Sequence, residues 1–338
     1  MYLFSVFTKI LHFLPSELSH HLALKGLKTL HFFGITSIIT KKKNEQNRLS
    51  NEIFFNLANK VGIAAGLDKN GEYIDSLASL GIGFLEVGTV TPKPQKGNPK
   101  PRIFRNVNEK SILNRLGFNN KGVDYLVKNL KKRNTDIIVG SSIGKNFDTP
   151  IEKASEDYIY CLERVYKYSD YIAINISSPN TEKLRDLSKV EHFDYLLKII
   201  KSKQDDLSVL FGYRPIFIKI SPDESCEDLN NICNSILKNK IDGIICSNTT
   251  TDHTDPKGLG GISGRPLKKK ATDTLIQVRN LLGDNLPIIA SGGVMSSKDY
   301  LEKIDAGANL VQLYTGFIFE GPKLIDDIVN LDSKVRNT

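Results

Sequence analysis

Residues 171–180 read Tyr171-Ile172-Ala173-Ile174-Asn175-Ile176-Ser177-Ser178-Pro179-Asn180, an apolar run that ends in small polar side chains. The apolar part is typical of a buried β-strand. Pro179 ends the strand because its nitrogen carries no hydrogen for the next ladder bond. In α/β enzymes, strands of this kind deliver polar groups to a ligand at one edge of the sheet. We therefore expect an α/β fold with a ligand site at the strand ends.

The same arrangement recurs along the chain. Eight apolar runs, each followed by a small polar residue, glycine or lysine and then by a helix-like segment, lie at residues 61–65, 84–87, 137–139, 171–176, 216–218, 243–246, 288–290 and 310–313. Eight strand–helix units in 338 residues predict a (β/α)8 TIM barrel. An open doubly wound sheet is the alternative, but its glycine-rich turn after the first strand is absent here.

Small residues follow the seventh and eighth runs, as Gly292-Gly293 and Thr315-Gly316. In such barrels these two loops often bind a phosphate through backbone N–H groups. Tight turns also use paired glycines, so the pattern favours a phosphate site without excluding a plain turn.

Residues 1–43 are expected to form an N-terminal module, and residues 44–338 the barrel domain. Apolar residues recur at helical spacing up to Pro15, and Ser16 is a candidate N-cap for a second amphipathic helix. Six lysines against one glutamate give the module a net charge of +5. Such a helical hairpin either packs on the barrel or lies in a membrane surface. No apolar run reaches the roughly 20 residues that span a bilayer.

The bulk composition is that of a globular protein, with 40% hydrophobic and 25% charged residues. A net charge of +8 indicates a basic surface, an anionic ligand or an anionic membrane face. The four cysteines have no metal-ligand spacing, which predicts reduced core thiols and no metal. Motifs that bind nucleic acid are absent.

The predicted strand ends carry two lysines, several amides and several hydroxyls, but neither a carboxylate pair nor a histidine. This composition argues against glycoside hydrolysis, metal-assisted hydrolysis and histidine acid–base chemistry. It suits a planar, anionic ligand, and together with the phosphate loops it fits flavin mononucleotide (FMN), which would carry the redox step.

Seven motifs in the same order resemble the dihydroorotate dehydrogenases, and they lie at residues 64–71, 88–92, 114–120, 175–181, 247–250, 260–267 and 314–317. The resemblance extends from the first residues to about Pro322. Ser178, where the soluble classes have cysteine, and the N-terminal helical extension indicate the membrane-associated, quinone-using class.

The resemblance implies oxidation of dihydroorotate to orotate in pyrimidine biosynthesis, with FMN as hydride acceptor and a membrane quinone as final electron acceptor. Ser178 would be the base that takes the C5 proton. The residues implied to bind substrate are Lys69, Asn114, Arg115, Leu116, Gly117, Phe118, Asn175, Asn180, Asn248 and Thr249. Those implied to bind one FMN per subunit are Ala65, Gly66, Leu67, Asp68, Lys69, Thr89, Ser142, Asn175, Lys219, Ser247, Gly264, Gly293, Tyr314 and Thr315. Arg105 and Tyr314 would lie near the quinone's route.

Two residues depart from the family pattern. Ser142 stands where asparagine is frequent, and Ser247 stands where threonine is usual. The resemblance further implies a monomer bound peripherally to the cytoplasmic face of a bacterial inner membrane. Two alternatives remain at this point: an FMN-barrel reductase that uses a nicotinamide, and a non-catalytic barrel that binds nucleotide and docks on membranes.

Overall fold

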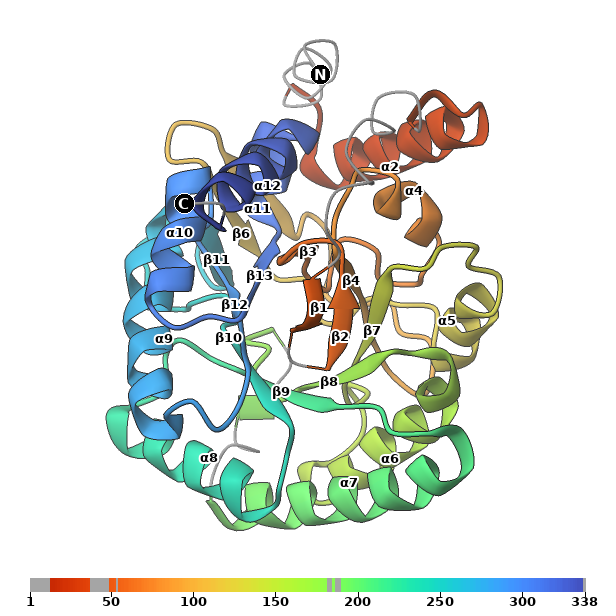
Figure 1. Ribbon diagram of the computed structural model, residues 1–338, viewed down its shortest axis with the longest axis vertical. Helices are drawn as coiled ribbons and strands as arrows, with labels where there is room; N and C mark the ends of the chain where they lie inside the picture. Colours follow the sequence, from red (N-terminus) through yellow and green to blue (C-terminus); the bar gives the residue numbers. More distant parts are fainter. Residues whose placement is uncertain (1–12, 37–48, 53, 181–183, 186–189, 337–338) are drawn as a thin grey trace.

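Eight parallel strands close into a barrel (Figure 1). The computed structural model describes residues 13–36, 49–52, 54–180, 184–185 and 190–336. The strands follow one another around the barrel in chain order, and the last pairs with the first. They are β3 (Val61–Ile63), β4 (Phe84–Val90), β7 (Ile138–Ile143), β8 (Tyr171–Asn175), β9 (Ile216–Ile220), β10 (Gly243–Cys246), β12 (Ile288–Ser291) and β13 (Leu310–Leu313). The predicted TIM barrel is confirmed, with strand ends shifted by up to four residues.

Helices cover the outside of the barrel. Each barrel strand is followed by at least one helix, and together these are α4 (Ile74–Ala78), α5 (Val123–Leu130), α6 (Ala154–Val165), α7 (Val190–Phe211), α8 (Cys226–Lys238), α9 (Lys268–Leu282), α10 (Ser297–Asp305), α11 (Thr315–Glu320) and α12 (Pro322–Arg336). Apolar side chains between helices and strands form the larger core. Cys161, Cys233 and Cys246 belong to it as predicted, whereas Cys226 at the start of α8 is exposed, so the expectation of a core thiol was wrong there.

A short antiparallel hairpin, β1 (Leu49–Glu52) and β2 (Phe55–Leu57), closes the N-terminal end of the barrel. Phe55 and Leu57 are buried in a second core with side chains from the strand starts, including Phe84, Tyr171 and Phe217. The Phe55 and Tyr171 ring centroids lie 5.7 Å apart. The barrel interior is therefore solid at this end, so a ligand can enter only from the opposite end.

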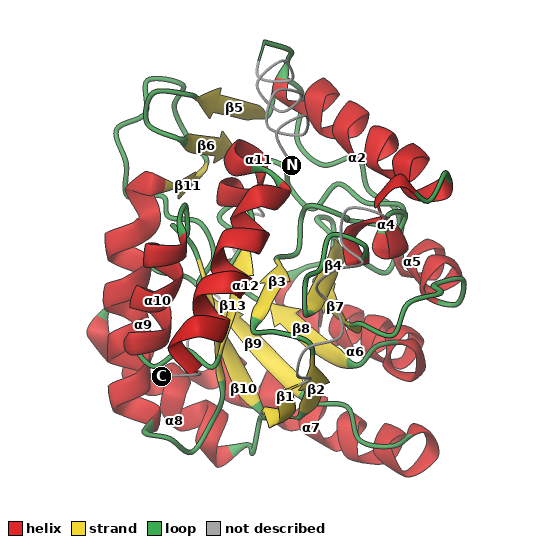
Figure 2. Cartoon of the chain, turned by 45° about the horizontal axis from the view of Figure 1, so that its top comes forward, coloured by secondary structure: helices red, strands yellow, loops and turns green. Residues whose placement is uncertain are grey.

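A three-stranded antiparallel sheet lies over the C-terminal end of the barrel (Figure 2). It consists of β5 (Ile103–Asn106), β6 (Ser111–Asn114) and β11 (Gly261–Gly264). β11 pairs with β6 so that Gly261 faces Asn114 and Gly264 faces Ser111. Two segments that lie far apart in the sequence, β6 and β11, thus meet beside the ends of the barrel strands.

The N-terminal helix α2 (Ser16–Phe32) packs on this end of the barrel. It contacts α4 and β5 and buries Leu24 and Leu27. The Glu17 carboxylate lies 2.8 Å from the Arg102 guanidinium, and Arg105 donates a 2.7 Å hydrogen bond to the Ser19 hydroxyl. Ser16 is the first residue of the helix, with Pro15 before it, so the expected serine cap was wrong.

The opposite face of α2 leaves large apolar side chains exposed. The exposed fractions are 48% for Leu18, 43% for Leu22 and 83% for Phe32, and Phe33, directly after the helix, is 69% exposed. The other helix expected in the module falls almost entirely on residues 1–12, outside the described residues. Within the described part, no helix is long and apolar enough to cross a bilayer.

The solid barrel interior predicts a strong contrast between two leucines. Leu310 is fully buried in the second core, whereas Leu210 on α7 is 70% exposed. We expect Leu310→Ala to lower the free energy of unfolding by about 2–5 kcal/mol, because it leaves a cavity. The same change at Leu210 should cost no more than about 0.5 kcal/mol. Urea denaturation of both variants measures the difference, and equal losses would contradict the assignment of Leu310 to the core.

Candidate active site

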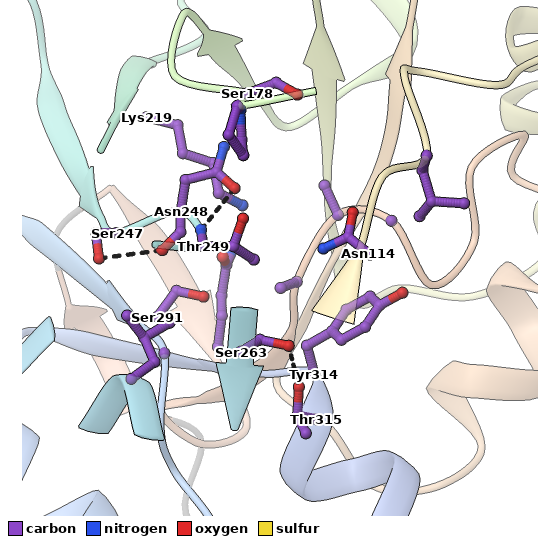
Figure 3. A pocket seen from close by; sticks show the side chains of 18 of the residues that line it. Asn114, Ser178, Lys219, Ser247, Asn248, Thr249, Ser263, Ser291, Tyr314 and Thr315 are labelled. Atoms are coloured by element: carbon purple, nitrogen blue, oxygen red, sulfur yellow. Dashed lines mark hydrogen bonds between the residues drawn. The ribbon is translucent and has the colours of Figure 1, made fainter. Parts of the chain in front are cut away.

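A pocket opens at the C-terminal ends of the barrel strands, beneath the β5–β6–β11 sheet (Figure 3). Every barrel strand, or the segment between it and the next helix, contributes residues to the described lining, except β7 and the segment that follows it. The predicted site residues that line it are Ala65, Gly66, Lys69, Asn114, Leu116, Gly117, Phe118, Asn175, Ser178, Asn180, Lys219, Ser247, Asn248, Thr249, Gly264, Gly293, Tyr314 and Thr315. The structure therefore brings most of the predicted residues into one cavity.

Side-chain amides on the pocket wall are held by one another. Asn175, the last residue of β8, donates to the Thr89 hydroxyl at 2.9 Å and accepts from the Asn248 amide at 3.3 Å. The Asn180 amide donates to the Asn114 oxygen at 3.0 Å. Because most of these groups have protein partners, their remaining donors and acceptors have fixed directions toward the cavity. Such a wall can read a flat ring with alternating donors and acceptors.

Ser178 lies directly after this strand end, with 6% of its surface exposed. Its Oγ accepts a 3.3 Å hydrogen bond from the backbone N–H of Asn180. The neighbouring Ser177 hydroxyl turns away from the cavity and donates to the Lys219 carbonyl at 2.7 Å. Of the two serines, only Ser178 belongs to the pocket lining.

Arg185 bonds to the backbone after both β8 and β10, the strands that precede these groups. Its guanidinium donates to the backbone carbonyls of Ser177, at 3.4 Å, and Thr249, at 3.3 Å. It also pairs with Asp223 at 3.0 Å, and Lys270 approaches the same carboxylate at 2.8 Å. The ends of β8 and β10 are thereby fixed relative to each other, a role that no sequence motif indicated.

The charged residues among the described lining are two lysines, Lys69 and Lys219, with no carboxylate. Burial, together with the nearby Arg102, lowers the pKa of Lys69 to about 8. The Thr249 hydroxyl is buried without a hydrogen-bond partner. A cationic cavity with an unused polar group is suited to an anionic, hydrogen-bonding ligand.

Two backbone positions bring the chain close to the cavity. Gly293 has a φ of 78°, and a Cβ there would lie 2.2 Å from the Lys268 backbone. Gly264 has a φ of 89°, and a Cβ would lie 2.2 Å from the Lys110 carbonyl. Only glycine fits these left-handed, crowded positions, which lets the backbone itself form the cavity wall.

Four predicted flavin residues lie outside the described lining. Leu67 is buried in the larger core, and the Asp68 carboxylate accepts hydrogen bonds from the backbone N–H groups of Glu72 and Tyr73. Thr89 and Ser142 share a 2.8 Å hydrogen bond one layer behind Asn175. Ser142, the departure from the family pattern, thus supports Thr89, and a direct contact of these four with flavin stays a prediction.

The two predicted arginines also lie outside the described lining. Arg115 donates to the Lys257 carbonyl at 2.8 Å and stacks over Phe104. Arg105 joins β5 to α2 through its bond to Ser19. The cavity side of α2 holds a residue that sequence reasoning did not select, His20, whose pKa burial lowers to about 4 and whose charged neighbours include Lys69. The imidazole is therefore neutral at physiological pH.

Several lining residues were missed from the sequence, among them Ser263, Ser291 and Gln312. Ser291 was visible as the polar end of the seventh apolar run. Gln312 was visible as a polar residue inside the eighth apolar run. Ser263 carried no comparable signal, because it reaches the cavity through the β11–β6 pairing.

Comparisons with known proteins give one consistent result. The family model for dihydroorotate dehydrogenase matches residues 49–333. A protein of Vibrio atlanticus named dihydroorotate dehydrogenase (quinone) is 50% identical over 94% of this chain and 96% of its own length. A protein of the same name from Shewanella denitrificans is 45% identical over 97% of this chain and 98% of its own.

Solved structures agree with these relatives. The dihydroorotate dehydrogenase of Eimeria tenella, crystallised in complex with ferulenol, superposes with a TM-score of 0.83 at 32% identity, over 95% of this chain and 91% of that one. The match covers the barrel and the elements that form the pocket, so the chain belongs to the dihydroorotate dehydrogenase family.

Proposed function

We propose that this chain oxidises dihydroorotate to orotate with FMN as its cofactor and a quinone as final electron acceptor, in pyrimidine biosynthesis. The observation that carries the proposal is the pocket wall, which places Ser178 among amides and two lysines without a carboxylate in the described lining. The names of the curated relatives support the same reaction and the same acceptor.

The residues of the pocket fit FMN. Bound there, FMN supplies a hydride acceptor for the substrate and passes the electrons on to the quinone. Gly293 and Gly264 let backbone approach closely, and Thr315 at the start of α11 is joined to Ser263 by a 2.8 Å hydrogen bond. These small groups would hold the phosphate, while Lys219 would stabilise negative charge on the reduced ring.

The substrate is assigned to the part of the pocket between β6 and the ends of β8 and β10. Asn114, Asn180 and Asn248 come from these elements and offer amides to a pyrimidine ring. The Lys69 ammonium, across the cavity on the loop after β3, would pair with the substrate carboxylate.

Ser178 would take the C5 proton of dihydroorotate while hydride leaves C6. A serine hydroxyl is a weak base, so it must act where other groups hold the substrate and exclude water. Its 6% exposure meets the second requirement. Among the described lining residues, no histidine or carboxylate is present to act as a stronger base.

Replacing Ser178 with alanine tests this role. We expect kcat for dihydroorotate-dependent flavin reduction to fall by about 10²–10⁴-fold, the range for a lost general base. Flavin content should stay that of the wild type, because Ser178 is not assigned to cofactor binding. Anaerobic stopped-flow absorbance measures the rate. An unchanged rate would favour a non-catalytic barrel or another base.

The lowered pKa of Lys69 predicts pH-dependent substrate binding. The ammonium is protonated below pH about 8 and becomes neutral above it, so the carboxylate partner is lost on the alkaline side. The ratio of kcat/KM for dihydroorotate in the wild type to that in Lys69→Met should fall as the pH rises from 7 to 9.5. Because both enzymes use the same substrate, any effect of substrate ionisation on kcat/KM cancels in the ratio. A ratio that is constant over this range would contradict the assignment.

The exposed face of α2 favours membrane association, and we place it against the lipid surface on the cytoplasmic side of a bacterial inner membrane. Leu18, Leu22 and Lys25 are exposed on this face. Apolar side chains beside a lysine suit the boundary between headgroups and acyl chains. Since α2 also packs beside the pocket through Ser19 and Arg105, a lipid-soluble quinone would reach the flavin from here, past Arg105 and Tyr314.

A pair of double variants tests the membrane face. Leu18→Asp with Leu22→Asp should abolish most binding to vesicles of mixed neutral and anionic lipid and slow reoxidation by a long-chain quinone, while flavin reduction by dihydroorotate persists. The matched control is Val209→Asp with Leu210→Asp, which changes two exposed apolar residues on α7. Co-sedimentation measures binding. Equal loss in both pairs would show that α2 has no special role.

The two alternatives from the sequence receive less support. The curated relatives are named for quinone rather than for a nicotinamide, which disfavours the reductase. A non-catalytic barrel would not need a serine hydroxyl in the pocket lining at the position of Ser178. The monomeric state stays a prediction.

A further inference from the structure

A carboxylate lies inside the barrel, directly below the flavin pocket. Glu86 in β4 is fully buried, and its side chain points into the barrel two residues after Phe84, which belongs to the apolar layer beneath. Lys219 and Gln312 stand two residues after Phe217 and Leu310 of the same layer. These side chains form the next layer up, between the apolar end and the cavity.

Both carboxylate oxygens of Glu86 have partners. Lys219 approaches Oε1 at 3.3 Å, while Oε2 accepts from the Gln312 amide at 2.8 Å and from the Tyr171 hydroxyl at 3.2 Å. Burial, and then the charge of Glu86, raises the pKa of Tyr171 well above its usual value, so this hydroxyl remains a donor. Four barrel strands, β4, β8, β9 and β13, thus meet at one carboxylate. We call these four residues the Glu86 cluster.

The Glu86 cluster is connected to the pocket by Lys219 and Gln312, which both line the cavity. A buried carboxylate without partners is strongly unfavourable, so the strands are held to this arrangement. The Lys219 ammonium, 6% exposed, therefore has a fixed position at the cavity wall. A ligand in the cavity therefore experiences the negative charge of Glu86 as well as the positive charge of Lys219.

We infer that Glu86 is a positioning residue for the flavin: it fixes the Lys219 ammonium beside the ring and, by its own charge, lowers the reduction potential of the bound cofactor. A positive charge near the ring favours the reduced, anionic form, and a negative charge in the same low-dielectric interior opposes it. The inference rests on the proposed assignment of Lys219 to the flavin.

The test is the midpoint potential of bound FMN, measured at pH 6 in holoenzyme variants. Glu86→Gln removes the charge but keeps the shape of the side chain. It should raise the equilibrium constant for flavin reduction by about tenfold or more, which is a rise of about 30 mV in the potential of a two-electron couple. Tyr171→Phe is the matched control, because it removes one hydrogen bond to the same carboxylate and leaves the charge. In this variant, the equilibrium constant for reduction of the flavin should stay within about threefold of the wild-type value.

Two further variants separate the possible failures. Lys219→Gln should disfavour reduced flavin. If it leaves the potential unchanged, the assignment of Lys219 is wrong and the inference falls with it. If Lys219→Gln shifts the potential but Glu86→Gln does not, the assignment stands and only the role of Glu86 is refuted.

If Glu86 served only to stabilise the fold, its variants would lose thermal stability without a change in flavin potential. The melting temperatures of Glu86→Gln and Tyr171→Phe would then fall alike while both retain the wild-type potential, and that result overturns the inference. Where Glu86→Gln does not fold, Glu86→Asp replaces it. The shorter side chain keeps the charge but withdraws it from Lys219, and a smaller shift toward reduced flavin is expected. An unchanged potential in Glu86→Asp also overturns the inference.

Discussion

The hydrogen-bonded closure of the barrel is the constraint on which the rest of the structure depends. All neighbouring barrel strands pair in parallel and β13 pairs with β3, so the C-terminal ends of the eight strands meet at one rim. Residues as distant in sequence as Lys69 and Tyr314 are neighbours around one cavity for this reason alone. Closure at the other end is achieved by packing: the β1–β2 hairpin fills it with Phe55 and Leu57. The site is therefore open on one side only.

The barrel interior changes in character along its axis. Rings and aliphatic side chains fill the lower layer, the Glu86 cluster forms the next, and amides and lysines line the cavity above. Each step of two residues along a strand moves a side chain one layer upward. A polar middle layer in a protein core is costly unless every group is paired. Its presence here places the Glu86 carboxylate, which balances the positive charge of Lys219, in the barrel interior and not on the described cavity wall.

Sequence patterns predicted the strands well, because buried parallel strands are continuous apolar runs and their polar ends are easily seen. They predicted the lining where a residue follows its own strand, as at Ser178 and Asn248. They did less well where position depends on pairing between distant segments. Ser263 reaches the cavity only because β11 pairs with β6, and those strands are too short and polar to be recognised in advance. Thr89 and Ser142 were expected to bind the flavin, but they bond to each other and neither belongs to the described lining.

The proposed membrane placement of α2 implies separate routes to the pocket for substrate and quinone. A charged pyrimidine needs an aqueous route, whereas a quinone with a long apolar tail must leave a bilayer without exposing that tail to water. The exposed apolar residues of α2 lie on the face away from the barrel, while Ser19 accepts a hydrogen bond from Arg105 and His20 lies near Lys69. In the proposed placement, α2 would separate the lipid surface from the flavin pocket. The ion pair between Glu17 and Arg102, which joins α2 to the segment before β5, would then help to keep this helix in place between the two.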